Sequence, residues 1–142
     1  MKYENTVRVL YSDTDAYGVV WHGAYVKWLE AGRVELSEML GLPLETLEQQ
    51  GVTFPVVELN IRYKSPALFN ERIVIETTID ELKNTSVKFA HRIYEQKTGK
   101  VHILASSTIV AIDKNGKLYR KLPENIYDCY NKAINKDTAC SL

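Results

Sequence analysis

Residues Gly23–Leu40 read GAYVKWLEAGRVELSEML and form the helical pattern around which the rest of the chain is organised. A period of 3.6 residues gathers apolar and small side chains on one face, namely Tyr25, Trp28, Leu29, Gly32, Leu36, Met39 and Leu40. Charged side chains fall on the opposite face: Lys27, Glu30, Glu35 and Glu38. Gly41 and Pro43 follow as helix-stop signals. The segment therefore predicts one long amphipathic helix with a single buried face.

Segments with a period of two residues flank this helix and predict strands. They cover about residues 3–11, 57–64, 73–80, 85–96 and 101–112. Short helices are predicted for about 44–50 and from Glu124, with a frayed end beyond the second. One long helix and about five long strands predict an α+β fold, in which an antiparallel sheet packs its apolar face on the helix. We expect a single domain over residues 1–142, with the short C-terminal helix and frayed tail at about 124–142.

Composition excludes several classes of protein. The chain has 142 residues, of which 45% are hydrophobic and 25% charged, as in an ordinary soluble domain. Its 18 basic and 18 acidic residues give a net charge of 0, which argues against a nucleic-acid partner. The most apolar stretch, 101–112, is shorter than the ~20 residues of a membrane helix, so no membrane span is expected. Cys129 and Cys140 lack CxxC spacing and are interpreted as free thiols of a cytoplasmic protein.

The segment before the helix, Tyr11–Tyr25 (YSDTDAYGVVWHGAY), carries the candidate chemistry. Asp13 and Asp15 leave a strand into a turn, and the helix begins near His22. The first N–H groups of a helix have no internal partner and favour negative charge, so this start could stabilise a developing oxyanion. A carboxylate a few residues earlier could then attack an acyl carbon, or activate water to do so.

Other readings of these residues stay open. Asp13 and Asp15 could be only turn formers or loose helix caps. A metal ion at these aspartates is disfavoured, because no further Asp, Glu or His cluster lies nearby in the sequence to complete its coordination. His22 could be a helix-start residue with no chemical role, and His91 and His102, within strand patterns, are expected to be structural.

Tyr11–Tyr25 resembles the signature of the 4-hydroxybenzoyl-CoA thioesterase-like branch of the hotdog superfamily, close to its Tol–Pal-type acyl-CoA thioesterases. Tyr63–Ala67 (YKSPA) and Lys117–Pro123 (KLYRKLP) add weaker matches, and the resemblance covers about residues 3–125. It implies a hotdog fold, in which a curved antiparallel sheet of about five strands wraps around one long central helix. It also implies homo-oligomers, with subunits paired edge to edge as dimers, usually continuing to a homotetramer, and active sites at the dimer interface.

Within this resemblance, Asp15 is the catalytic carboxylate and Asp13 is a non-catalytic aspartate of the same loop. The backbone N–H of His22 would polarise the thioester carbonyl, and the His22 side chain could assist. Tyr17 departs from the small residue or Pro-Ala that usually precedes the glycine, which would reshape the entrance. We therefore expect Asp15 and His22 to be the catalytic residues.

The expected activity is that of an acyl-CoA thioesterase, which releases a free carboxylic acid and CoA with no metal and no bound cofactor. Candidate substrate- and CoA-binding residues are Tyr25, Arg62, Lys64 and Ser65, with Lys88 and Arg92 as weaker candidates. The basic residues could bind the CoA phosphates, although exposed charges that protect a sheet edge would show the same pattern. Alternative functions are a non-catalytic hotdog module that binds acyl carriers or partner proteins, and a dehydratase or hydratase that pairs His22 with Asp15. The identity of the acyl group, and the choice between Asp15 as nucleophile and as base, stay open.

Overall fold

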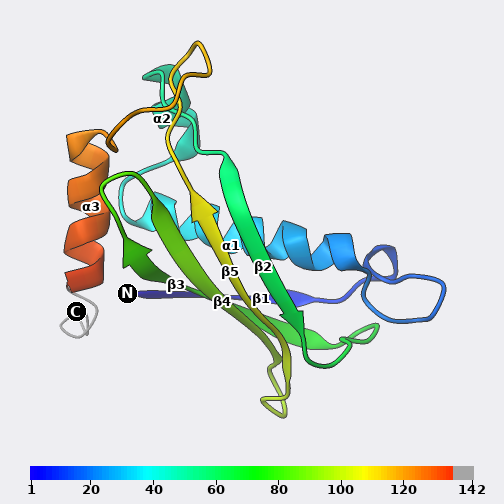
Figure 1. Ribbon diagram of the computed structural model, residues 1–142. Coiled ribbons are helices and arrows are strands. Elements are labelled where there is room, and N and C mark those ends of the chain that lie inside the picture. The colour runs from blue at the N-terminus through cyan, green and yellow to red at the C-terminus, as the bar shows by residue number, and fades with distance from the viewer. Residues whose placement is uncertain (136–142) are drawn as a thin grey trace.

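A long helix, α1 (His22–Met39), lies across one face of an antiparallel sheet in the computed structural model, which describes residues 1–135 (Figure 1). Within the described residues, five strands pair in the order β1-β3-β4-β5-β2. Their bounds are β1 (Lys2–Arg8), β2 (Val56–Tyr63), β3 (Arg72–Leu82), β4 (Val87–Glu95) and β5 (Val101–Ile109). The curved sheet and its central helix confirm the α+β hotdog prediction.

The order of the strands leaves β1 and β2 at the two edges of the sheet. The three inner strands are half buried in alternation, with buried residues at every second position along most of β4. Each strand pairs antiparallel with its neighbours, with register shifts along β2, β3 and β5 that mark bulges or irregularities. Within the described residues, β2 pairs only with β5. Its outer edge is therefore free to pair with a further strand.

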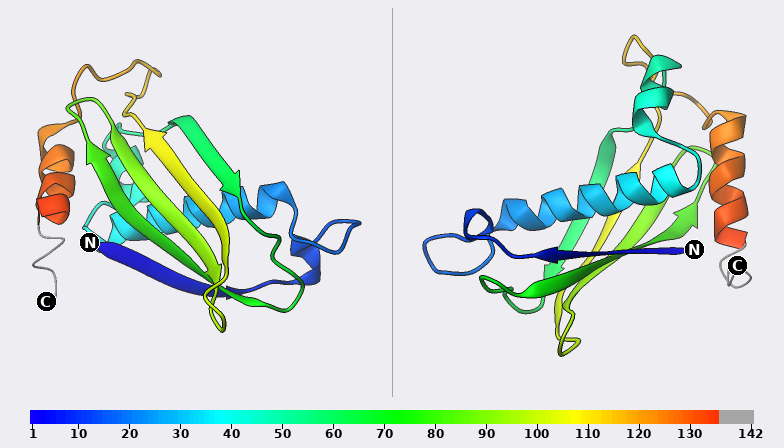
Figure 2. Two further views of the ribbon diagram at one scale, coloured as in Figure 1. Left: turned by 60° about the horizontal axis from the view of Figure 1, so that its bottom comes forward. Right: turned by 180° about the vertical axis from the view of Figure 1, so that it is seen from behind.

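The remaining elements lie at the two ends of α1. A single 3-10 turn, η1 (Tyr11–Asp13), belongs to the loop that precedes the helix. The short helix α2 (Leu44–Gln49) follows α1, and α3 (Glu124–Asn135) packs at the end of the molecule away from the η1 loop (Figure 2). The frayed end expected after α3 lies outside the described residues.

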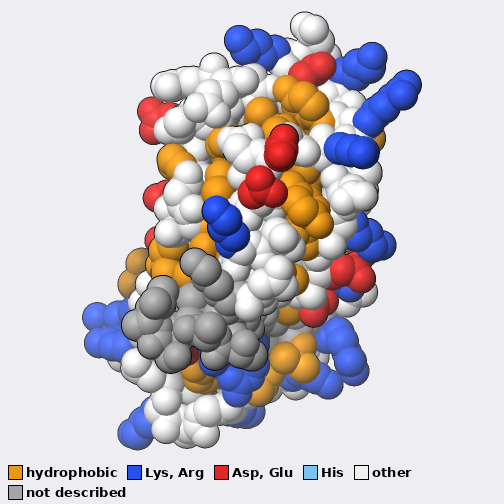
Figure 3. All heavy atoms as spheres, turned by 90° about the vertical axis from the view of Figure 1, so that its left-hand side faces the viewer, with side chains coloured by type: hydrophobic (Ala, Val, Ile, Leu, Met, Phe, Trp, Pro, Cys, Tyr) orange, Lys and Arg blue, Asp and Glu red, His pale blue; other side chains and the backbone are white. Residues whose placement is uncertain are grey.

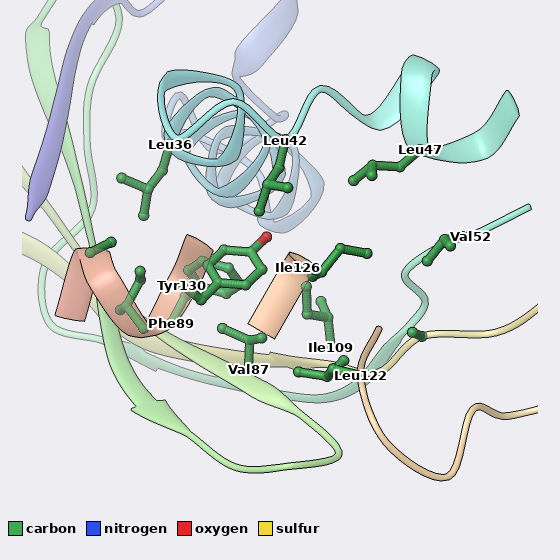
Figure 4. Close-up of a cluster of buried hydrophobic side chains, with 13 residues drawn as sticks. Leu36, Leu42, Leu47, Val52, Val87, Phe89, Ile109, Leu122, Ile126 and Tyr130 are labelled. Atoms are coloured by element: carbon green, nitrogen blue, oxygen red, sulfur yellow. The ribbon is translucent and has the colours of Figure 1, made fainter. Parts of the chain in front are cut away.

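The core forms two clusters along α1. The cluster at the N-terminal half contains Val9, Val20, Ala24, Tyr25, Trp28, Leu29, Ala67, Ile73, Ile75, Ile93 and Ile103. The other cluster packs Leu36 and Leu42 against α3, where Phe89 and Tyr130 contact edge to face (Figure 4). The Tyr130 hydroxyl also lies 2.8 Å from the buried Ser37 hydroxyl. The C-terminal cluster thus fixes α1, while the N-terminal cluster leads to the candidate site.

Three local expectations differ from the structure. The strand expected to reach Tyr11 ends at Arg8, because Leu10 donates its N–H to Asp13 Oδ2 at 2.8 Å and turns the chain. Met39, expected in the core, is 54% exposed in the last turn of α1. Val57 and Leu59 have the alternation of a buried face but are exposed, because α1 packs mainly over β3 and β1 and leaves β2 largely uncovered.

The surface carries charges of both signs. On the face that bears α3, lysine and arginine side chains lie at both ends with acidic side chains among them, and hydrophobic side chains lie between (Figure 3). This distribution agrees with the net charge of 0. Among the described residues, no helix is long and apolar enough to cross a membrane.

Candidate active site

Asp13 closes the loop that precedes α1. Its Oδ2 accepts the Leu10 N–H at 2.8 Å, and its carbonyl oxygen accepts the Trp21 N–H at 2.9 Å. The two bonds join the beginning and the end of the loop. In the structure, Asp13 thus acts as a turn former, one of the alternatives that the sequence left open.

Asp15 organises a second, tighter turn within this loop. Its Oδ1 accepts the N–H of Tyr17 at 2.8 Å and that of Val19 at 3.4 Å, while its own N–H donates to the Val19 carbonyl at 2.8 Å. The Asp15 side chain is exposed, and its Oδ2 accepts no hydrogen bond from residues 1–135. The turn therefore holds one carboxylate oxygen and leaves the other available.

The start of α1 offers two unpaired donors. Trp21 is the N-cap, and the first turn is bonded through the Ala24 N–H to the Trp21 carbonyl at 3.1 Å. The amides of His22 and Gly23 find no acceptor in the part of the chain that the structure describes. Such amides carry the positive end of the helix dipole, which favours a negative group there.

The Trp21 ring lies close against Gly23. A Cβ built on Gly23 would lie 2.0 Å from the Trp21 ring, so a side chain there would displace the indole. Trp21 is 49% exposed and lies over the first turn of the helix. An aromatic ring therefore lies beside the first turn, which carries the two free amides.

A cavity of about 250 Å³ lies beside the start of α1. Its lining residues are Val19, Val20, His22, Tyr25, Tyr63, Lys64, Ser65 and Pro66. The ring centroid of Tyr63 lies 5.4 Å from that of His22 and 5.8 Å from that of Tyr25, both in edge-to-face geometry. The cavity thus has an aromatic wall next to His22.

Tyr25 joins the helix to the opposite wall of the cavity. Its hydroxyl accepts the Ala67 N–H at 3.0 Å, and burial raises the pKa of the phenol. The phenol therefore stays protonated at neutral pH and can still donate its own hydrogen.

The structure brings several of the expected site residues together and leaves others apart. His22, Tyr25, Lys64 and Ser65 line the cavity. Asp15 is not among the lining residues of this cavity, although its charge acts on the Tyr25 phenol. The Ser65 hydroxyl is occupied, since it donates to the Val101 carbonyl at 2.8 Å.

The remaining basic candidates lie elsewhere. Arg62 is exposed on β2 and does not line the cavity. On β4, Lys88 lies 3.9 Å from the Asp80 carboxylate, and Arg92 lies 3.5 Å from the Glu76 carboxylate. Among the basic candidates, Lys64 is thus the one placed at the cavity, and the CoA role stays a prediction for all of them.

Tyr63 lines the cavity, although the sequence predicted for it only a place in the strand 57–64. Its signal was present, because it directly precedes Lys64-Ser65-Pro66 in the motif that resembles the family. Alternation along β2 suggested a buried core side chain, whereas Tyr63 is 50% exposed at the cavity.

Within residues 1–135, no group of three or more His, Cys, Asp or Glu side chains is placed to hold a metal ion. The expectation of a metal-free and cofactor-free reaction stays a prediction. Cys129 is a free cysteine on α3, and Cys140 lies outside the described residues.

Comparison with known proteins gives consistent matches. Residues 9–128 match the family model described as the thioesterase-like superfamily. The chain is 33% identical to YneP of Bacillus subtilis (strain 168), over 89% of this chain and 94% of YneP. It is 32% identical to the acyl-CoA thioester hydrolase YbgC of Escherichia coli O157:H7, over 84% of this chain and 89% of YbgC.

A crystal structure of a 4-hydroxybenzoyl-CoA thioesterase variant in complex with 4-hydroxybenzoyl-CoA has the same fold. Its TM-score is 0.80 at 23% identity, and the match covers 90% of this chain and 97% of that chain. At this identity the likeness concerns the fold alone.

Proposed function

The chain belongs to the thioesterase-like superfamily and is a thioester hydrolase; on this premise we propose that it hydrolyses an acyl-CoA to a free carboxylic acid and CoA. One juxtaposition supports the proposal: the Asp15 turn lies directly before a helix whose first two amides, those of His22 and Gly23, are free, and His22 lines an apolar cavity.

In the proposed reaction, the amide of His22 binds the thioester carbonyl oxygen and stabilises the negative charge that develops on it. A single preorganised donor of this kind typically contributes about 2.7–4 kcal/mol to catalysis. The first turn of α1 supplies the amide at no cost in reorganisation, because the helix holds it in place before substrate arrives.

The Asp15 carboxylate supplies the second half of the reaction. Oδ1 is held by the turn, which orients Oδ2 for one of two steps. As a base, the carboxylate takes a proton from the water that attacks the carbonyl carbon. As a nucleophile, it attacks that carbon itself and forms an anhydride that water then cleaves. In both routes the CoA thiolate leaves and takes up a proton, so neither a metal nor a bound cofactor is needed.

Pairing of two subunits would complete the site. Asp15 is exposed in the single chain, while a developing charge is best stabilised where water is excluded. The free edge strand β2 exposes Val56, Val57 and Leu59. Beside it lies a second cavity of about 320 Å³, lined by Val26, Leu29 and Leu59 among others. We propose that two copies pair along β2 and form a dimer or a tetramer.

Binding of the CoA portion would use the basic residues beside the cavity. Lys64 borders the cavity directly after the end of β2, and Arg62 lies two residues earlier on that strand. Their charges suit phosphate groups, for which arginine and lysine are the usual partners. The enzyme would act in the cytoplasm, as the cysteine usage suggests.

The proposal is tested with a panel of short aliphatic, long aliphatic and aromatic acyl-CoAs, with colorimetric detection of the released thiol. The wild-type chain should hydrolyse at least one class, and Asp15→Asn should lose about 10²-fold or more of kcat. Asparagine keeps an oxygen for the Tyr17 N–H, so the turn should persist.

Asp113→Asn is the matched control. Asp113 Oδ1 accepts the N–H groups of Asn115 and Lys117 at 2.8 and 2.9 Å, in a turn similar to that of Asp15 but within another loop. Full activity in this variant, with loss in Asp15→Asn, supports the proposal. Equal activity of all three proteins across the panel would refute the role of Asp15. Binding of acyl-CoA without thiol release by the wild type would instead support a non-catalytic acyl-carrier module.

A further inference from the structure

His102 is a buried histidine on β5 that contacts both ends of the segment 64–71, whose first three residues line the cavity. Its side chain is 1% exposed. Nδ1 lies 2.9 Å from the Ser65 hydroxyl and 3.1 Å from the Ser65 carbonyl oxygen. On the other side of the ring, Nε2 lies 3.4 Å from Glu71 Oε1. One imidazole ring therefore spans the segment from its beginning to its end.

The backbone around His102 holds the same segment. The carbonyl oxygen of His102 accepts the Lys64 N–H at 2.8 Å, and the Ser65 hydroxyl donates to the Val101 carbonyl at 2.8 Å. At the far end, Glu71 Oε1 also accepts the Leu68 N–H at 2.7 Å. The Glu71 carboxylate thus faces both the histidine and the middle of the segment.

The centre of the segment is bonded to the start of α1. Ala67 is fully buried; its N–H donates to the Tyr25 hydroxyl at 3.0 Å, and its carbonyl oxygen accepts the Val20 N–H at 3.0 Å. A displacement of Ala67 would therefore shift both Tyr25 and the residue two positions before His22.

The next two residues contact the loop that carries Asp15. Leu68 forms an isolated antiparallel bridge with Val19, and Val19 exchanges hydrogen bonds with Asp15. Phe69 stacks on Tyr11, with ring centroids 4.1 Å apart and an interplanar angle of 17°. Segment 64–71 is therefore the support on which the Asp15 loop rests.

One buried ring nitrogen of His102 lacks a hydrogen-bond partner within the described residues. Nε2 is buried and makes no hydrogen bond of standard geometry within the described residues; Glu71 is the acceptor that faces it. The Ser65 hydroxyl gives its hydrogen to the Val101 carbonyl, so Nδ1 is the donor toward Ser65, and Nε2 donates to Glu71 only when both ring nitrogens carry a proton.

We infer that His102 and Glu71 are positioning residues, which tether segment 64–71 so that Asp15 and the free amides of α1 keep their mutual geometry. The inference rests on the proposed function for its kinetic consequence, but not for its structural one. His102 does not touch the reacting atoms; it acts through Ala67, Leu68 and Val19.

The test uses His102→Asn, Glu71→Gln and the double variant. The asparagine amide keeps a polar group near the position of Nδ1, and the substitution removes Nε2, the ring atom that lies near Glu71. We expect amide hydrogen exchange at Val20 and Ala67 to become about 10-fold faster or more, because the segment opens locally, while amides of β3 and β4 are unchanged.

We expect kcat for acyl-CoA hydrolysis to fall about 10- to 10²-fold, with a smaller change in KM, because the carboxylate is misplaced. The double variant should be no worse than the more affected single variant.

His91→Asn is the matched control. His91 is also a buried histidine of the sheet, 4% exposed, but its ring contacts Thr77 and Ser107, which do not line the cavity. His91→Asn should lower the global stability of the protein. Amide exchange at Val20 and Ala67 should rise no more than this loss of stability accounts for, and kcat should stay unchanged. A merely structural role of His102 would give both histidine variants the same profile.

Unchanged exchange at Val20 and Ala67 in a folded His102→Asn protein would overturn the inference. If that variant does not fold, Glu71→Gln and Ser65→Ala carry the same measurement, since Glu71 is 19% exposed and only its charge is removed. A wild-type protein without hydrolase activity would refute the proposed function. It would not decide on the positioning role of His102 and Glu71, which the hydrogen-exchange experiment tests independently.

Discussion

Gly32 of α1 lies directly against Thr77 of β3: a Cβ at position 32 would be 2.3 Å from Thr77 Oγ1. At this point the helix approaches the sheet over a buried row of polar side chains. Thr77 Oγ1 lies 3.2 Å from His91 Nδ1, and His91 Nε2 lies 2.8 Å from Ser107 Oγ. The row lies between the two core clusters and fixes how closely the helix can pack on the sheet.

Replacement of Gly32 by alanine should destabilise the protein. Replacement of an exposed helical glycine by alanine usually raises the free energy of unfolding by up to about 1 kcal/mol. Here the added methyl group must displace the Thr77 hydroxyl from the polar row, and overpacking of this kind costs about 1–3 kcal/mol. Urea unfolding of wild type and Gly32→Ala measures the difference. A variant at least as stable as wild type would show that the helix can shift freely on the sheet.

The stability of the protein should fall in acid through His91. Burial lowers the pKa of this imidazole from 6.5 to about 4, and the charge of Arg33 adds to the effect. Between about pH 6.5 and pH 4 the unfolded chain binds a proton that the folded chain refuses, so the folded state loses stability as the pH falls through this window. The loss attributable to His91 is on the order of 3 kcal/mol.

Comparison of His91→Gln with wild type isolates this contribution. The variant lacks the titrating group, so its free energy of unfolding should change less between pH 7 and pH 4 than that of wild type. Parallel curves for the two proteins would mean that His91 does not titrate as its burial requires.

A proline at position 22 should separate the amide of His22 from its side chain. Position 22 is the first residue of α1, where proline fits, and Trp21 before it has φ −82° and ψ 159°, a conformation that proline favours in its predecessor. His22→Pro removes the N–H and should lower kcat by about 10²- to 10³-fold with little change in stability. His22→Ala keeps the amide and serves as its control, with a smaller loss. Equal losses in the two variants would assign the effect to the imidazole instead.

A charge on the free edge of the sheet should prevent subunit pairing. Leu59 is 41% exposed on β2 and lines the cavity of about 320 Å³ beside α1. Leu59→Glu should convert a dimer or tetramer into a monomer in sedimentation equilibrium and lower kcat at the same time. Thr6→Glu, on the other edge strand β1, should leave both unchanged. A wild-type chain that sediments as a monomer would contradict the pairing.

Much of the fold could be predicted because its signals are local. The helical spacing of Tyr25, Trp28, Leu29 and Leu36 and the alternation of β3 are consequences of backbone geometry, which neighbouring residues impose on each other. The candidate chemistry was local as well, since Asp15 and the start of the helix lie seven residues apart. The long motif could therefore be interpreted before any coordinates.

Other features depended on partners distant in the sequence. The alternation of side chains along β2 does not show which face of the strand is buried. Only the tertiary structure placed β2 at the edge of the sheet and left Leu59 exposed. Ser65 looked like a ligand-binding hydroxyl, but its partners Val101 and His102 lie more than 30 residues away.

The sequence by itself determined most of the helices and strands and the α+β class, because these depend on short-range spacing, and its long motif resembled the family and named Asp15 and His22 as candidates for the chemistry. Only the tertiary structure decided which side chains meet: it placed Tyr63 at the cavity, engaged the Ser65 hydroxyl and set His102 between Ser65 and Glu71. The physical reason is that burial and hydrogen bonding between strands are set by packing across the sheet, which no single stretch of sequence contains.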